Sequence, residues 1–211
     1  MPSSRKGARV YNVIEGVSRT LCDMVSLILS SDPQVEKFIG LDFSDQAISA
    51  SLSSPDSMDN GVSVYLYSVR PNPYLGNTEE NIIRNIPGQG DLYEQRKYDM
   101  SLDLYYMITP HLSNHSLELK AIERVMQILN GLPVLTEESL DDEIVEAGNR
   151  EIRIEPISLN LDETNKLWSI FPNTSYKVSI FYVLTPVSIK SFRVPEFASP
   201  AKEILTAMRR S

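Results

Sequence analysis

Two histidines come closest to the pattern of a metal site. His111 and His115 lie four positions apart, with Glu118 shortly after them, and two histidines at this spacing on one helical face would suit zinc. However, Pro110 and the helix-capping residues at 113–114 place His111 ahead of any helix, and the pattern supplies no third strong ligand. We therefore expect one loop histidine and one histidine at a helix start, and neither a metal nor another cofactor.

Three further patterns are too weak to indicate catalysis. Residues 88–90 form a lone GxG without the lysine-containing sequence that completes a phosphate-binding loop, so we interpret them as a turn. Asp99 and Asp103 share the outward face of one strand, but no neighbouring group would give the two carboxyls different proton affinities. Hydration or contact with another subunit explains them better. Cys22 has no histidine near it in sequence. We therefore do not expect an enzyme.

The composition limits the classes of function. Of 211 residues, 42% are hydrophobic and 23% charged, which is typical of a folded domain. The net charge of −8 disfavours a general nucleic-acid binder, which needs a basic surface. No apolar run reaches the roughly 18–20 residues of a membrane span. Glu15 and Asp23 interrupt the N-terminal apolar segment that would otherwise resemble a signal peptide, and a single cysteine fits a reducing compartment, so we expect assembly in the cytoplasm.

One long strand is the clearest structural signal. Residues 98–109 alternate with a period of two, which predicts a half-buried strand with one face on the core. The mixed chemistry of the other face predicts that it meets water or another subunit. The expected core face carries Tyr98, Met100, Leu102, Leu104, Tyr106 and Ile108, and the other face carries Asp99, Ser101, Asp103, Tyr105, Met107 and Thr109.

Two main helices are predicted from the helical spacing of apolar residues. The first covers 13–30 and ends ahead of Pro33, because proline disfavours helix in the preceding residue. The second follows the cap at 113–114, and Gly131 and Pro133 supply its stop signal. The stripe expected to face the core on the second helix consists of Leu117, Ala121, Ile122, Val125, Met126 and Leu129.

Shorter elements complete the pattern. Strands are predicted at 62–70, 152–159 and 176–190, and less clearly at 35–41 and 47–52. Pro156 cannot donate a ladder hydrogen bond, so its strand belongs at an edge or bulge. Asn160 and Glu163 open a short helix that carries Trp168, which we expect to anchor the core. The acidic segment 137–146 is interpreted as a solvated face with a short helix.

Two segments are interpreted as arms. Residues 71–94 show no periodicity, and a loop longer than about 12–15 residues is usually functional. The tail 192–211 combines irregular chain with a helix over 201–210 that is too short to be stable alone. We therefore predict a single α/β (α+β) domain at residues 1–190, with a mixed, mostly antiparallel sheet packed by two main helices and an extended loop, followed by a C-terminal arm with a short helix at 191–211.

Four motifs occur in a fixed order. After a leucine-rich first helix come VSVYLYSVRPNPYLGN at 62–77, LDLYYMIT at 102–109 ahead of the helix at 121–129, and LWS at 167–169 ahead of a tyrosine-bearing strand. With these motifs in this order, over about residues 10–190, the chain resembles the tail-terminator or cap proteins of contractile injection systems, the phage-tail-like particles that some bacteria assemble.

The resemblance implies a structural protein. It implies a ring, hexameric by analogy with tail symmetry, that caps the inner tube, ends tube growth and secures the last sheath ring. Its partners would be further copies, the tube protein and the sheath protein, with no nucleic acid and no membrane insertion. The finished protein would be part of the particle, inside or outside the cell. Candidate interface residues are Tyr74, Leu75, Asp99, Asp103, Tyr105, Phe192, Val194, Phe197, Ile204, Leu205 and Met208.

Two alternatives remain open at this point. One is a phage neck or tail-completion protein, which would share the fold but lie between tail and head connector. The other is a small cytoplasmic enzyme whose site the motifs do not reveal, and a deep apolar pocket with converging polar groups would favour it.

Overall fold

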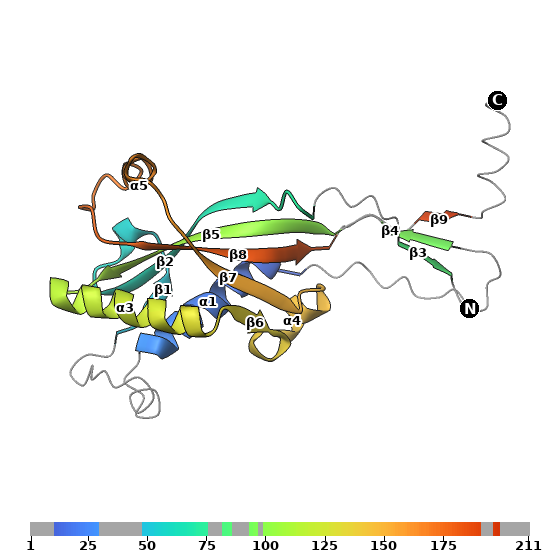
Figure 1. Cartoon of the computed structure of the whole chain (residues 1–211), viewed down its shortest axis with the longest axis horizontal. Helices are drawn as coiled ribbons and strands as arrows, with labels where there is room; N and C mark the ends of the chain where they lie inside the picture. The colour runs from blue at the N-terminus through green and yellow to red at the C-terminus, as the bar shows by residue number, and fades with distance from the viewer. Residues whose placement is uncertain are drawn as a thin grey trace.

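A curled six-stranded sheet with helices on both faces forms the body of the protein in the computed structural model (Figure 1). Residues 11–29, 48–75 and 99–190 are described in full, and 82–85, 93–96 and 196–198 by their backbone. The strand order is β1-β2-β5-β8-β7-β6. These strands are β1 (Ala50–Leu52), β2 (Gly61–Pro71), β5 (Met100–His111), β6 (Val134–Thr136), β7 (Glu151–Ile157) and β8 (Ile180–Ile189). The β1–β2 pair is parallel and the other pairs are antiparallel, which confirms the predicted mixed sheet.

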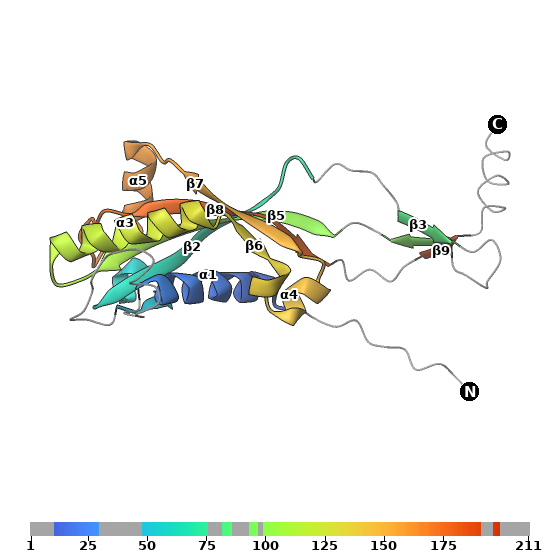
Figure 2. The ribbon, with the colours of Figure 1, turned by 60° about the horizontal axis from the view of Figure 1, so that its bottom comes forward.

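Helices cover the two faces unequally. Figure 2 shows the long helices α1 and α3 on one face of the sheet and the short α5 on the other. This α+β arrangement confirms the predicted fold class and its two main helices. The helical segments are α1 (Val13–Leu29), α3 (His115–Gly131), α4 (Asp142–Glu146) and α5 (Leu161–Trp168), with single turns η1 (Pro55–Ser57) and η2 (Glu137–Ser139).

The central strand β5 is buried on both faces. Its predicted core face is confirmed from Leu102 to Ile108, which lie in the main cluster with α1 and α3. Met100 on the same face is exposed, because the strand there runs past the helices. On the opposite face Met107 and Thr109 are fully buried, so the expectation that this whole face meets water or another subunit is wrong there.

The main core combines α1, α3 and the inner sheet face. In α3, Asn114 caps the helix by accepting a hydrogen bond from the Ser116 backbone N–H at 2.8 Å, as expected of an N-cap. The predicted α3 stripe is wrong at Met126, which is 45% exposed, whereas Glu118 and Arg124 are buried. Because α3 packs against both α1 and β5, its neighbours decide which side is buried, and apolar spacing alone does not show them.

A smaller aromatic cluster lies on the opposite face of the sheet. Trp168 at the end of α5 is buried and meets Phe171 edge-to-face, with ring centroids 5.9 Å apart. Phe171 in turn meets Tyr65 of β2 at 5.4 Å. Met107 and Phe181 complete the buried part of this cluster. The prediction that Trp168 is a core anchor is confirmed.

Proline and glycine lie where strand geometry requires them. Pro156 pairs with Tyr182 of β8, beyond the short β6, which reaches only residues 151–153 of β7. The edge position predicted for Pro156 is therefore confirmed. Gly61 opens β2 with a φ of 129°, and a Cβ there would lie 2.6 Å from the Ser49 carbonyl oxygen. That conformation suits glycine and strains other residues.

The acidic segment is only partly solvated. Its carboxylates are exposed around η2 and α4, as predicted, but Leu140 and Ile144 are buried in the main core. Gly16 of α1 lies under Ile144, where a Cβ would come within 3.0 Å of that side chain. A glycine on α1 thus lets α4 approach closely.

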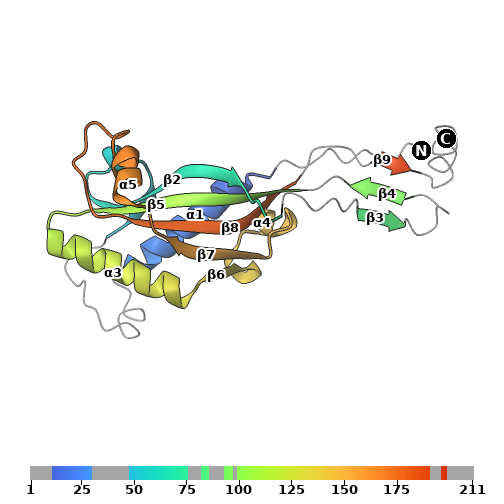
Figure 3. The ribbon, with the colours of Figure 1, turned by 45° about the horizontal axis from the view of Figure 1, so that its top comes forward.

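A second, three-stranded sheet lies in the segments predicted as arms. It contains β3 (Ile82–Asn85), β4 (Tyr93–Arg96) and β9 (Glu196–Ala198) in the order β3-β4-β9, all antiparallel. Figure 3 shows it beyond the ends of β2, β5 and β8. The prediction of 71–94 as a loop is therefore wrong at β3 and β4, and that of irregular chain before 199 is wrong at β9. The predicted strand at 35–41 and the helix at 201–210 lie outside the described residues.

A buried carboxylate joins α3 to the segment before β8. Glu118 accepts hydrogen bonds from the Leu112 backbone N–H at 3.2 Å, from His115 Nδ1 at 3.3 Å and from Lys177 Nζ. Burial by itself raises the pKa of Glu118, but these hydrogen bonds, with that of Lys177 the strongest, outweigh burial and lower the pKa below its ordinary value. The folded protein therefore favours the charged carboxylate.

Replacing this carboxylate gives a pH-dependent loss of stability. A carboxyl whose pKa is lower in the folded than in the unfolded protein stabilises the fold at pH values above its unfolded-state pKa. This stabilisation disappears as the pH falls through the folded-state pKa. We expect Glu118→Gln to lower the free energy of unfolding by about 1–3 kcal/mol at pH 7. The difference from wild type should narrow once the pH falls below 4.5, the ordinary value. Urea unfolding at a series of pH values measures this. Glu123→Gln on the exposed side of α3 is the control, and an equal effect of both variants would contradict the expectation.

The aromatic cluster predicts a second stability effect. Trp168→Ala removes the largest ring of a cluster that holds α5 on the sheet, and we expect a loss of about 3–5 kcal/mol. Leu161→Ala at the exposed start of α5 should change the stability by less than about 0.5 kcal/mol. Thermal unfolding followed by circular dichroism compares the two. Similar melting temperatures for both variants would show that the cluster does not stabilise the domain.

Candidate functional site

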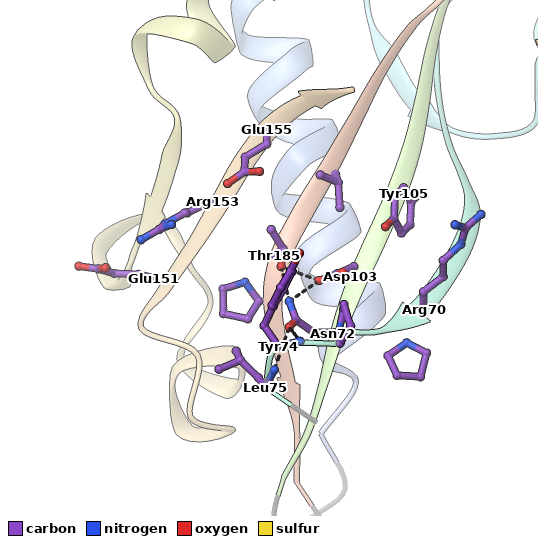
Figure 4. Close-up of a pocket in the computed structure, with 14 residues that line it drawn as sticks. Arg70, Asn72, Tyr74, Leu75, Asp103, Tyr105, Glu151, Arg153, Glu155 and Thr185 are labelled. Carbon is purple, nitrogen blue, oxygen red and sulfur yellow. Dashed lines mark hydrogen bonds between the residues drawn. The ribbon is translucent and has the colours of Figure 1, made fainter. Parts of the chain in front are cut away.

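A groove crosses the part of the outer sheet face that α5 leaves uncovered. It encloses about 820 Å³ and lies between β2, β5, β8, β7 and the turn at 72–75 (Figure 4). Strand alternation puts Tyr105 and Val183 of the groove on the same face as Met107 and Phe181 of the aromatic cluster. The lining consists of Arg70, Pro71, Asn72, Pro73, Tyr74, Leu75, Asp103, Tyr105, Glu151, Arg153, Glu155, Val183, Thr185 and Pro186.

Three polar side chains form the floor of the groove. Asp103 of β5 accepts hydrogen bonds from Asn72 Nδ2 at 2.8 Å and from the Thr185 hydroxyl at 2.5 Å. Asn72 Nδ2 also donates to Thr185 Oγ1 at 3.1 Å, which closes the triangle visible in Figure 4. The triangle lies where β8 places two residues, Thr185 and Pro186, opposite the single Asp103. This bulge brings the Thr185 hydroxyl toward the carboxylate.

Asn72 also fixes the turn that forms one wall. Its side-chain oxygen accepts hydrogen bonds from the backbone N–H of Tyr74 at 3.0 Å and of Leu75 at 3.1 Å, in the manner of an Asx turn. The Asn72 side-chain nitrogen thus bonds to the floor of the groove, and the side-chain oxygen bonds to the turn. The turn holds Tyr74 at the rim with 89% of its surface exposed.

Charged residues lie on both sides of the groove. On β2, the Arg70 guanidinium lies over the Tyr105 ring, 4.9 Å from its centroid, which is cation–π geometry. On β7, Glu151, Arg153 and Glu155 alternate along one exposed face. Such a rim of mixed sign with an exposed aromatic residue suits contact with a polypeptide surface more than binding of a single anion or cation.

An apolar wall joins the groove to the aromatic cluster. Tyr67 of β2 lies 6.1 Å from both the Tyr105 ring and the Phe181 ring, measured between centroids. Burial raises the pKa of Tyr67 to about 12, although Arg70 opposes the shift. Tyr67 therefore stays a neutral phenol at physiological pH, and the groove and the cluster form one continuous aromatic surface.

The predicted interface residues fall into three groups. Tyr74, Leu75, Asp103 and Tyr105 come together in the groove. Asp99 lies in an exposed position just ahead of β5, outside the groove lining, and Phe197 lies in β9. Phe192, Val194, Ile204, Leu205 and Met208 lie outside the described residues. The interface role of all eleven stays a prediction.

Asp103 differs from its expected environment. The alternation of β5 predicted an outward carboxylate that is hydrated or contacts another subunit, but its own chain buries it to 8% exposure through Asn72 and Thr185. The sequence pattern did not identify these two partners, nor Arg153 and Glu155 on the rim. The Asn72–Pro73 dipeptide after a strand was the one local signal for this turn.

The remaining chemical candidates lie apart from the groove. His111 is the last residue of β5 and is buried, with its Nε2 3.5 Å from Ser63 Oγ. Burial lowers the pKa of His111, nearby Lys177 lowers it further, and Glu118 opposes the shift. Within the described residues no three histidine, cysteine or acidic side chains gather as metal ligands. Burial, with a contribution from Asp23, raises the pKa of the Cys22 thiol to about 11, so the thiol is unreactive. Over the same residues no helix is long and apolar enough to cross a bilayer.

Comparison with solved structures identifies two proteins of the same fold. The sheath/tube terminator of PVC, an extracellular contractile injection system, in its extended state has a TM-score of 0.53 and 16% identity, covering 96% of this chain and 71% of that one. The anti-feeding prophage cap, a tube terminating cap, has a TM-score of 0.57 and 16% identity, covering 90% of this chain and 59% of that one. The chain thus spans less than two thirds of the second protein. At this identity the likeness shows the fold alone.

Comparison at the sequence level is more specific. No curated protein matches the chain significantly. The family described as the Pvc16 N-terminal domain matches residues 16–203, which include every helix and strand of the main sheet except the first turn of α1. Because this match covers most of the sequence, the chain belongs to the Pvc16 N-terminal domain family.

Proposed function

We propose that the protein is a tail terminator, a structural cap on the inner tube of a contractile injection particle. The observation that carries the proposal is the family match over residues 16–203. It is supported by the shared fold with one protein named as a sheath/tube terminator and another named as a tube terminating cap. The motifs at 62–77, 102–109 and 167–169 point to the same family from the sequence.

The proposed mechanism is binding without catalysis. Copies of the chain form a ring, hexameric by analogy with tail symmetry, on the last ring of tube subunits. The ring occupies the positions that the next tube subunits would take, so the tube stops growing, and it holds the last sheath ring in place. Assembly takes place in the cytoplasm, and the cap then remains part of the particle.

The groove is the surface we assign to a tube or sheath partner. It is open and long enough to accept side chains of another polypeptide, and its rim offers Tyr74, Arg153 and Glu155. Tyrosine and arginine are among the residue types that contribute most to protein–protein affinity. The floor is rigid because Asp103, Asn72 and Thr185 bond to one another. Binding therefore requires little ordering of the groove itself.

End-capping of purified tubes tests the function. Tubes freed of their caps should bind the protein at one end only, seen by gold labelling in negative-stain images. Added tube subunits should then fail to lengthen the labelled ends. The physical reason is occupation of the site that the next subunit needs. Continued growth at the rate of untreated tubes, or labelling along the tube wall, would contradict the proposal.

Groove variants test the docking surface separately. Tyr74→Ala combined with Arg153→Ala removes the rim aromatic and one rim charge without touching the floor. We expect the variant to bind the tube end about tenfold more weakly, which corresponds to a loss of about 1.4 kcal/mol in binding free energy. The matched control is Leu161→Ala with Lys166→Ala on exposed positions of α5. If the groove variant and the control cap equally well, the partner binds elsewhere, and the capping function itself is unaffected.

A further inference from the structure

Within the described residues, the outer strands β3 and β9 of the small sheet each have one pairing partner, the middle strand β4. Within the described part of the chain, no strand pairs with the outer edge of β3 or of β9. Each outer edge therefore presents backbone N–H and C=O groups that another strand can pair with.

The sequence of this sheet is unusual for a free edge. The register places Ile82, Arg84, Glu94, Arg96 and Phe197 on one face, and Ile83, Asn85, Tyr93, Gln95, Glu196 and Ala198 on the other. The apolar aliphatic residues and Phe197 thus belong to the outer strands β3 and β9, whereas three of the four residues of the middle strand are charged or amide-bearing. Free edges are normally protected by charged residues or proline, and the middle of a sheet is normally its most apolar part. Each outer strand carries one charged residue, Arg84 in β3 and Glu196 in β9, yet both strands are more apolar than the middle strand, which favours a partner that covers them.

From these observations we infer that β9 of one copy pairs with β3 of the next copy, so that the small sheets join head to tail around the proposed ring. Both β3 and β9 run antiparallel to β4, so they run in the same direction. A neighbouring copy in the same orientation therefore brings its β3 alongside β9 as a parallel strand. The inference rests on the proposed ring, and it names the contact that closes it.

Pairing across this seam groups residues of like character. On one face Phe197 of β9 comes next to the strand that carries Ile82, and on the other face Ala198 comes next to the strand that carries Ile83. Within one copy Phe197 and Ala198 pair instead with Glu94 and Tyr93 of β4, and Ile82 and Ile83 pair with Arg96 and Gln95. Figures 1 and 3 place the small sheet at the far end of the long axis from α3.

Head-to-tail pairing also gives each outer strand a second partner. A two-fold arrangement would pair β3 with β3, or β9 with β9, and each such contact would leave the other edge of every copy unpaired. A heterologous contact that repeats around a closed ring uses both edges of every copy with one kind of interface. A single kind of contact then satisfies both rows of backbone groups.

Disulfide trapping in the full-length chain tests the seam. Ile83→Cys with Ala198→Cys places two thiols on the same face of the outer strands. Asn85→Cys with Ala198→Cys is a second same-face pair, two residues further along β3. Two strand spacings, roughly 9–10 Å, separate β3 from β9 within one copy. A disulfide needs Cα atoms within about 7 Å, so the bond can form only between copies. Mild oxidation should convert at least one same-face pair into a ladder of covalent multimers on a non-reducing gel.

The control differs by one residue. Ile82→Cys with Ala198→Cys puts the thiols on opposite faces, and it should stay monomeric on the same gel. The wild-type chain should also stay monomeric, because its one cysteine, Cys22, is buried on α1. Equal ladders from same-face and opposite-face pairs, or covalent dimers from Ala198→Cys alone, would overturn the head-to-tail seam.

Ring formation is measured independently of cross-linking. Light scattering of the wild-type protein and the tube-capping images report whether the ring and the cap exist. Rings that cap tubes without any same-face ladder would overturn the seam and leave the proposed function standing. A ladder from a protein that does not bind tube ends would support the seam and contradict the cap. Far-ultraviolet circular dichroism confirms that each variant is folded.

Discussion

Strand β5 packs against the helices α1 and α3 on one face and against the aromatic cluster and groove on the other. The rest of the structure depends on this double packing. On one face Leu104 and Tyr106 lie under α1 and α3, where the Tyr106 and Ser18 hydroxyls share a 2.7 Å hydrogen bond. On the other face Met107 supports the aromatic cluster, and Asp103 forms the groove floor. A shift of one residue would exchange these faces and place a carboxylate in the apolar core. The register of β5 therefore sets the core and the candidate site together.

Features decided by local sequence could be predicted. The apolar period of α1, the Asn114 cap and the capping box of Asn160 with Glu163 are read from neighbouring residues, and the structure contains all three. The alternation of β5 predicted its core side because that face is uniformly apolar. The ordered motifs also pointed to one family, and the family match places the chain in the Pvc16 N-terminal domain family, with the fold of two proteins named as terminator and cap.

Features decided by distant residues could not be predicted. Asp103 finds Asn72 and Thr185, which lie 31 and 82 positions away in the chain, so no local pattern revealed that it is buried. The exposed Met126 follows from how α3 sits between α1 and β5. Strands β3, β4 and β9 were missed because each is only three or four residues long and β3 and β4 lack alternation, so their pairing partners rather than their sequences define them.

The position of Asn72 has a mechanical consequence. It directly follows β2, and its amide group is bonded both to the turn at 72–75 and, through Asp103 and Thr185, to β5 and β8. A pull on that turn is therefore shared among three adjacent strands. If the link were absent, the same pull would act on the end of β2 alone.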